Sequence, residues 1–191
     1  MQNILDTDKN LFLFFNKFTG STPVIDDLVR LVVNEYFIPV TLALFIVFMW
    51  FSKKSQRKIV TIGALSVGLV NLTIAILNQF VFRPRPFDEL SVNLLFYKPT
   101  DPSFPSNAAA VAFALAISIF IVNRRIGLVA IGLSAIYSFS RFYAGVHYPT
   151  DILAGMILGG FSPIIISRFE KLINFLTSLI QEAQSKLRLD L

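Results

Sequence analysis

Long uncharged stretches divide the chain into segments close to the length of a bilayer span. A helix needs about 20 mostly apolar residues to cross the hydrocarbon core. The uncharged segments lie at Tyr36–Phe51, Ile59–Phe82, Asn107–Asn123, Ile126–Phe139 and Ile152–Ser167. This pattern predicts an all-α, multi-pass membrane helical bundle with five spans, or six if the segment Val24–Val33 forms part of a further span.

The two ends of the chain carry helical periodicity of another kind. Near the N-terminus, the spacing of four apolar residues predicts one face of a short interfacial helix: Leu5, Phe12, Phe15 and Phe18. Residues 169–189 alternate apolar with charged and amide side chains at helical spacing, which is typical of a helix lying on a membrane or on a partner. These patterns predict a single integral-membrane domain over residues 1–191, with amphipathic N- and C-terminal helices.

Positive charges predict how the bundle is oriented. If the spans alternate, one side receives the Lys53–Lys58 loop, the Arg124–Arg125 pair, and Arg168 with Lys171. Lysine and arginine in short loops favour the cytoplasmic side. The loops Arg83–Ser106 and Arg141–Asp151 then share the outer face, and the C-terminus is cytoplasmic.

Composition supports a cell-membrane location and narrows the chemistry. The chain is 54% hydrophobic and 15% charged, with a mean hydropathy of +0.66, whereas ordinary soluble domains carry about 25% charged residues. The absence of cysteine excludes disulfides and thiolate metal sites, and the single histidine excludes any site that needs two. The net charge of +5 says more about orientation than about nucleic acid. The expected partners are the bilayer and a lipid substrate, with no nucleic acid and the oligomeric state left open.

Three polar segments on the predicted outer face could carry chemistry. In the first, Arg83-Pro84-Arg85-Pro86, prolines hold two guanidiniums at a helix mouth, and guanidiniums bind phosphate oxygens in a bidentate way. Anchoring to lipid headgroups is the simpler explanation of the same arginines. In the second segment, Ser106 or Asn107 is suited to begin a helix, whose N-terminus would attract an anion or simply be capped.

The third segment, Ser140 to Asp151, contains the only histidine. Pro149 suits the first position of a helix, so Asp151 falls in its first turn and could reach back to the ring N–H of His147. A helix-dipole role for Asp151 and a wet interfacial place for His147 are the simpler alternatives. The three segments together favour transfer of a phosphoryl group to nitrogen and then to water, with arginines neutralising the phosphate.

One further pattern concerns packing. Gly155 and Gly159 lie four residues apart in the last apolar segment, a spacing of small residues that lets helices approach closely. The expectation is close packing inside the bundle, with a dimer contact as the alternative.

The third segment resembles the third signature motif of the type 2 phosphatidic acid phosphatase superfamily: Ser140-Arg141, five residues, His147, three residues and Asp151. Pro105-Ser106 is similar to the start of the second motif, and Arg85-Pro86 to the end of the first. The resemblance covers about residues 60–165 and is strongest to the bacterial undecaprenyl-diphosphatase branch associated with bacitracin resistance.

This resemblance implies a compact helical membrane phosphatase, with its site at the membrane surface and without a metal or another cofactor. It implies that His147 is the nucleophile and Asp151 its orienting carboxylate, while Arg85, Ser106 and Arg141 hold the phosphate. Arg83 and Asn107 are further candidates for substrate binding. The implied reaction converts a polyprenyl diphosphate to the monophosphate and inorganic phosphate through a phosphohistidine. Hydrolysis of phosphatidic acid or phosphatidylglycerol phosphate and binding without turnover remain as alternatives.

Two positions depart from the family pattern. Asn78 stands where the first motif has a lysine, and Ala108 stands where the second has a histidine that acts as general acid. A general acid contributes a factor of about 10² to 10⁴, but a diphosphate needs it less, because its leaving phosphate has a pKa of about 6. Ala108 is therefore explained either by a natural preference for diphosphates or loss of activity, or by deliberate replacement of histidine in an inactive form.

Overall fold

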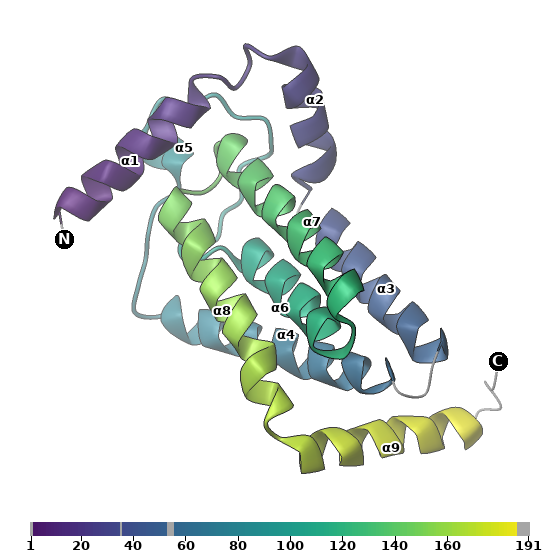
Figure 1. Ribbon diagram of the computed structural model, residues 1–191. Coiled ribbons are helices and arrows are strands. Elements are labelled where there is room, and N and C mark those ends of the chain that lie inside the picture. The colour runs from purple at the N-terminus through teal and green to yellow at the C-terminus, as the bar shows by residue number, and fades with distance from the viewer. Residues whose placement is uncertain (1, 35, 53–55, 187–191) are drawn as a thin grey trace.

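The computed structural model describes residues 2–34, 36–52 and 56–186, and within these ranges it contains nine α-helices and no β-strand (Figure 1). The helices are α1 (Gln2–Asn16), α2 (Pro23–Val32), α3 (Phe37–Ser52), α4 (Lys58–Leu77), α5 (Pro86–Glu89), α6 (Asn107–Val122), α7 (Arg124–Tyr143), α8 (Pro149–Ser167) and α9 (Glu170–Lys186). The all-α prediction is confirmed for this part of the chain.

Helix α6 forms the centre of the bundle and contacts α3, α4, α7 and α8 (Figure 1). Its buried positions are mostly alanines, whose small side chains let the neighbouring helices approach. Helix α8 approaches most closely: a Cβ added at Gly155 would overlap the carbonyl oxygen of Ser106, and one at Gly159 that of Ala110. The predicted glycine spacing therefore serves packing inside the bundle and holds the start of α8 against the start of α6.

The predicted count of five to six spans is not confirmed. Among the described residues, α4, α7 and α8 are long and apolar enough to cross a membrane, and α2 with α3 adds a fourth candidate as a pair bent by 48°. Helix α6 is apolar but has 16 residues, so its length is about 24 Å against a hydrocarbon core of about 30 Å. It is short because Ser106 caps its start and Asn123 ends it, the Asn123 side chain capping α7 in turn.

The terminal helices lie across opposite ends of the bundle (Figure 1). Helix α1 lies where α7 ends and α8 begins, and it buries Phe12 against Phe142 and Tyr148. The predicted interfacial face is not confirmed: Phe12 is buried in the bundle, Phe15 is half-buried, Leu5 is 43% exposed, and Phe18 follows the end of the helix at Asn16. Beside Phe12, the helix also buries the polar side chains of Asp8 and Asn16.

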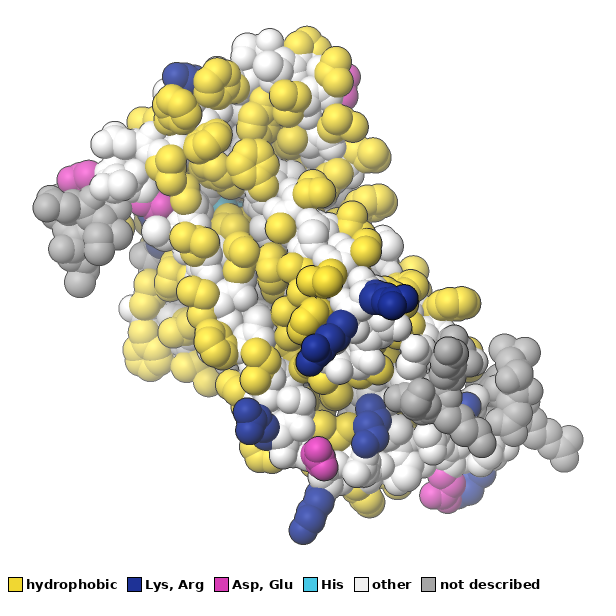
Figure 2. Space-filling model, viewed as in Figure 1, with side chains coloured by type: hydrophobic (Ala, Val, Ile, Leu, Met, Phe, Trp, Pro, Cys, Tyr) yellow, Lys and Arg dark blue, Asp and Glu magenta, His cyan; other side chains and the backbone are white. Residues whose placement is uncertain are grey.

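Helix α9 packs on α4 and continues to Lys186; residues 187–189 of the predicted tail helix lie outside the described residues. It buries Ile173 and Thr177 and leaves apolar side chains exposed at Leu172, Phe175, Leu179 and Ile180, and Phe169 just before the helix is exposed as well. In the face drawn in Figure 2, hydrophobic side chains cover the flank of α7 and α8, and most Lys and Arg side chains lie toward the α9 end.

Candidate functional site

A proline-rich loop between α4 and α6 holds Arg85 in the interior, where it is 3% exposed. Pro84 fixes the backbone before it, and Pro86 begins the short helix α5 after it. Its guanidinium donates from Nε to the Asp101 carbonyl and from Nη2 to Asp101 Oδ1, each at 2.9 Å. These contacts, with one from Nη1 to the Val146 carbonyl at 2.9 Å, aim the guanidinium at the loop that carries the histidine.

His147 lies in a tight loop between α7 and α8 and is 2% exposed. Gly145 makes the turn with a φ of 88°, a conformation that L side chains rarely adopt, and an added Cβ would come within 2.9 Å of the Asn93 carbonyl. Pro149 then begins α8, as predicted. Gly145 before His147 and Pro149 after it thus fix the backbone of the loop that carries the imidazole.

The ring contacts of His147 define its tautomer. Nδ1 lies 2.9 Å from the Ser103 carbonyl oxygen, which can only accept, so the hydrogen is assigned to Nδ1. Nε2 then carries the lone pair and lies 3.3 Å from Nη1 of Arg85. The ring nitrogen that carries the lone pair therefore faces the guanidinium of Arg85.

Asp151 reaches the imidazole less directly than the sequence predicts. Its Oδ2 lies 3.8 Å from Nδ1 of His147, too far for a hydrogen bond. The Ser103 hydroxyl donates to Oδ2 at 2.6 Å and lies 3.5 Å from Nδ1. The ring N–H therefore bonds to the Ser103 carbonyl oxygen and not to Asp151 as expected. The Asp151 carboxylate lies nearby as a negative charge.

Asp151 is itself fully buried and held by several donors. Its Oδ2 accepts the backbone N–H of Tyr148 at 2.9 Å, so it caps the helix on which it lies. Its Oδ1 accepts Nη1 of Arg83 at 2.6 Å. Asp151 thus lies in the first turn of α8, where the helix-dipole alternative places it, and its carboxylate also caps that turn.

Burial and neighbouring charges set the protonation of His147. Burial is the largest cause that lowers its pKa to about 4, and the positive charges of Arg85 and Arg141 lower it further, against the opposing effect of Asp151. The imidazole is therefore neutral near pH 7, which is the form in which Nε2 can attack phosphorus.

The start of α6 lies beside the first turn of α8. Ser106 is buried, its hydroxyl accepts the Ala109 N–H at 3.4 Å, and its own N–H donates to the Asp151 carbonyl at 3.0 Å. The N-cap prediction is confirmed. Asn107 is exposed at the helix start, while Ala108 is half-buried and packs against the core cluster that contains Leu115.

The remaining two predicted arginines have different surroundings. Arg141 is 1% exposed, donates from Nη1 to the Val33 carbonyl at 3.0 Å and lies 5.0 Å from the centre of the Phe96 ring. Its charge nevertheless acts on His147. Arg83 directs Nη1 at Thr150 as well as Asp151, and Nη2 at Asp8. Of the predicted site residues, Arg85 therefore contacts His147 directly, whereas Arg83 contacts Asp151.

Three residues of the site were missed from the sequence: Asp8, Asp101 and Ser103. Ser103 precedes the helix start at Ser106 by three positions in the proline-rich loop, which is a weak signal for a site residue. Asp8 lies in a helix predicted only to face the membrane interface. No sequence motif marks any of the three residues, because their contacts depend on how distant segments pack.

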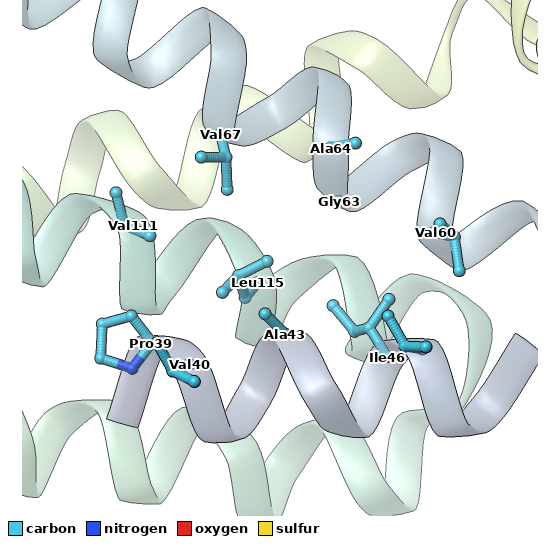
Figure 3. Close-up of a pocket in the computed structure, with 11 residues that line it drawn as sticks. Pro39, Val40, Ala43, Ile46, Val60, Gly63, Ala64, Val67, Val111 and Leu115 are labelled. Carbon is cyan, nitrogen blue, oxygen red and sulfur yellow. The ribbon is translucent and has the colours of Figure 1, made fainter. Parts of the chain in front are cut away.

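A large apolar cavity lies elsewhere in the bundle. It has a volume of about 390 Å³ and lies between α3, α4 and α6 (Figure 3). Its lining is apolar and is shared by residues such as Val40, Ala64 and Leu115. It contains none of the polar residues around His147, so the reactive chemistry lies outside it. Among the described residues, no group of three or more His, Asp or Glu side chains is placed to hold a metal ion.

The site thus places a buried imidazole against a guanidinium at one end of a helical bundle that contains apolar helices of membrane-spanning length. The family model described as the PAP2 superfamily matches residues 58–174. The chain belongs to this superfamily.

Individual relatives agree with that assignment. The chain is 30% identical to the undecaprenyl-diphosphatase BcrC of Bacillus subtilis, over 81% of this chain and 80% of that protein. It is 31% identical to an undecaprenyl-diphosphatase of Sulfolobus acidocaldarius, over 72% of this chain and 65% of that protein. The crystal structure of Aquifex aeolicus LpxE superposes with a TM-score of 0.67 at 27% identity, covering 84% of this chain and 94% of that one. These findings make the chain a hydrolase of the lipid phosphatase class.

Proposed function

We propose that this protein hydrolyses a polyprenyl diphosphate of the undecaprenyl type to the lipid monophosphate and inorganic phosphate. The observation that carries the proposal is the arrangement of His147, with Nδ1 bonded to the Ser103 carbonyl and Nε2 facing Arg85. The names of the relatives supply the substrate class. Arg141 and Ser106 complete the proposed phosphate site, and Asn107 lies at its exposed edge.

The reaction proceeds in two displacements. In the first, the Nε2 lone pair forms a bond to the terminal phosphorus, the bond from that phosphorus to the bridging oxygen breaks, and the lipid monophosphate leaves. The imidazole becomes positively charged, and the carboxylate of Asp151 stabilises that charge. In the second, water attacks phosphorus, the N–P bond breaks, and inorganic phosphate leaves as the water loses its proton to solvent.

Arg85 is the main electrophilic group in this scheme. Its guanidinium is held by Asp101 and the Val146 carbonyl, so it is oriented before substrate arrives. A preoriented positive charge stabilises the phosphoryl oxygens in the transition state without reorganisation. Nη1 lies 3.3 Å from Nε2, so the guanidinium is directly beside the nitrogen that would bond to phosphorus and can donate to the phosphoryl oxygens once that nitrogen is engaged.

Ala108 favours the diphosphate over a monoester. No side chain at this position can protonate a leaving group, and the chain has no second histidine to replace it. A leaving phosphate with a pKa of about 6 needs no proton at neutral pH, whereas a lipid alkoxide does. The same absence is the feature that would favour a non-catalytic lipid-phosphate binder.

The proposal includes five spans and an orientation in the cell membrane. Helices α3 and α6 join α4, α7 and α8 in the bilayer, with the His147 site at the outer face and the C-terminus in the cytoplasm. Support comes from the end of the bundle that carries the α6–α7 turn and α9, where Arg124, Arg125, Arg168 and Lys171 are exposed (Figures 1 and 2). Lys53 and Lys54, which belong to the same argument, lie outside the described residues.

The test measures phosphate release by the purified protein from undecaprenyl diphosphate, undecaprenyl monophosphate, phosphatidic acid and phosphatidylglycerol phosphate. The chain with Ala108 should release phosphate from the diphosphate and little from the monoesters. Ala108→His should raise monoester turnover by about 10²- to 10⁴-fold and diphosphate turnover much less. Acid-labile, base-stable label retained on the protein after a brief reaction with terminally labelled diphosphate would identify the phosphohistidine.

The outcomes separate the alternatives. Preference for phosphatidic acid or phosphatidylglycerol phosphate would replace the proposed substrate while retaining the chemistry. Saturable lipid binding without phosphate release, by the chain as it stands and by Ala108→His alike, would show a binder and overturn the proposed reaction.

A further inference from the structure

Asp8 is a buried carboxylate that lies outside the residues matched by the family model. It belongs to α1 and is 4% exposed, although much of that helix faces outward. Burying a carboxylate is costly unless charge and hydrogen bonds compensate it. The contacts that compensate Asp8 therefore show what the residue is placed to do.

The first set of contacts is to the start of α8. Asp8 Oδ1 accepts the backbone N–H of Thr150 at 3.0 Å, and Oδ2 accepts the Thr150 hydroxyl at 2.6 Å. The first N–H groups of a helix have no partner within that helix, and a carboxylate there is favourable. Asp8 thus caps α8 from another helix, while Asp151 caps the same turn from within, through the Tyr148 N–H.

The second contact is to Arg83. Its Nη2 donates to Asp8 Oδ2 and its Nη1 to Asp151 Oδ1, each at 2.6 Å, and the guanidinium lies 4.0 Å from the centre of the Tyr148 ring. Arg83 is thereby held between two carboxylates. This arrangement suits a clamp between helices better than the substrate-binding role predicted for Arg83 from the sequence.

The clamp connects to the nucleophile through a continuous set of contacts. Asp8 holds Arg83, Arg83 holds Asp151, and Asp151 accepts the Ser103 hydroxyl at 2.6 Å. The Ser103 carbonyl in turn fixes Nδ1 of His147 at 2.9 Å. Phe12, one turn after Asp8, packs on Tyr148 and holds α1 in place over this region.

We infer that Asp8 is a positioning residue that acts through Arg83 and Thr150 to hold the first turn of α8, and hence Asp151 and His147, in the reactive arrangement. The inference rests on the proposed phosphatase function. By this inference the N-terminal helix α1 positions groups of the site, in addition to any contact that it makes with the membrane.

The test compares Asp8→Asn with Asp6→Asn, a change of the same chemistry at an exposed position of the same helix. Displacement of catalytic groups by about 1 Å costs about 10²-fold in rate. Asp8→Asn should therefore lower kcat by about 10- to 100-fold with little change in KM, because Arg85 and Arg141 still bind the phosphate. Asp6→Asn should match the unaltered protein, and equal kcat values in the two variants would overturn the inference.

A double-mutant cycle shows whether Asp8 acts through Arg83. Asp8→Asn should lower kcat much less in an Arg83→Gln background than alone, whereas independent, multiplying effects would contradict the assignment. Asp8→Glu keeps the charge on a longer arm, and its kcat should lie between those of the unaltered protein and Asp8→Asn. If Asp8→Asn does not fold, Asp8→Glu decides: reduced kcat at unchanged KM supports positioning, and unaltered kcat overturns it.

The comparison does not depend on which lipid is the true substrate. Kinetics are measured with whichever lipid the unaltered protein hydrolyses, so a failed substrate proposal leaves this test intact. If the unaltered protein hydrolyses none of the lipids, the binding of orthovanadate and of inorganic phosphate is measured instead. Vanadate forms a five-coordinate adduct that resembles the transition state, whereas phosphate does not. Asp8→Asn should weaken vanadate binding about tenfold more than phosphate binding; equal weakening of both, or of neither, would overturn the inference.

Discussion

Helices α1 and α9 lie across opposite ends of the bundle and are held there by different kinds of contact. Helix α1 buries a carboxylate, Asp8, which joins a charged network that extends to Asp151, beside the proposed nucleophile His147. Helix α9 buries Ile173 and pairs the hydroxyl of Thr177 with that of Thr61 on α4 at 2.9 Å. Both helices have apolar side chains exposed, so the exposed surface does not distinguish them. The buried polar groups do, because Asp8 of α1 joins a charged network that includes Arg83 and Asp151, whereas Thr177 of α9 pairs with a hydroxyl of α4.

The largest difference between the two ends is expected in phosphate release, when a residue near the α1 end and one of α9 are each replaced. His147→Ala should abolish phosphate release, because no other histidine exists to accept the phosphoryl group. Asp151→Asn should leave measurable activity, since the Ser103 carbonyl still orients the ring. Thr177→Ala on α9 should leave kcat unchanged, and phosphate release with the best substrate measures all three. Equal and total loss in His147→Ala and Asp151→Asn would argue against a purely orienting role for Asp151.

Much of the nucleophile's environment was predictable from the chain, and the reason is local spacing. Pro149 at a helix start places Asp151 in the first turn, and Ser106 caps α6, because both relations depend on neighbours within four residues. The contribution of Asp8 was not predictable, because it depends on α1 docking against a loop that lies far along the chain. Apolar periodicity in α1 predicted an outward face and gave no sign that a carboxylate would be buried.

The next prediction tests how tightly the start of α8 is held near the α1 end. A Cβ at Gly155 would overlap the Ser106 carbonyl, whereas one at Gly160 would meet nothing within 4 Å. Gly155→Ala should therefore destabilise the protein by about 1–3 kcal/mol and lower kcat, because the contact from the Ser106 N–H to the Asp151 carbonyl shifts. Gly160→Ala should be neutral or stabilising by up to about 1 kcal/mol. Thermal unfolding in detergent gives the comparison, and similar midpoints for both variants would contradict the close approach.

The pKa of the single histidine should respond to a charge removed near the site and not to one removed at the α9 end. The pKa of His147 is lowered to about 4, first by burial and then by Arg85 and Arg141, so it should rise in Arg85→Gln while burial still holds it below its ordinary value of about 6.5. Arg168→Gln, at the α9 end, should leave it unchanged. The imidazole resonance in NMR reports this pKa directly, because the chain has one histidine. An unchanged pKa in Arg85→Gln would contradict an electrostatic effect of Arg85 on the imidazole.

The same shift has a consequence for stability. A histidine whose pKa is lower in the folded than in the unfolded state favours folding fully above the unfolded value and loses that contribution as the pH falls. Stability should therefore decline between about pH 6.5 and about pH 4 as the unfolded chain takes up the proton first. His147→Ala should lack this part of the pH dependence, which denaturant unfolding at several pH values would measure.

The smallest expected effect on phosphate release comes from changes in the packing of α9. Thr177→Val leaves the buried hydroxyl of Thr61 without its partner, at a cost of about 1–3 kcal/mol, whereas removing both hydroxyls can be nearly neutral. The double variant Thr61→Val with Thr177→Val should therefore be more stable than Thr177→Val alone, and kcat should stay constant in both. Thermal midpoints and phosphate release are measured on the same preparations. A fall in kcat that follows the change in stability would show that the α9 end is coupled to the site, and the contrast between the two terminal helices would then be one of degree.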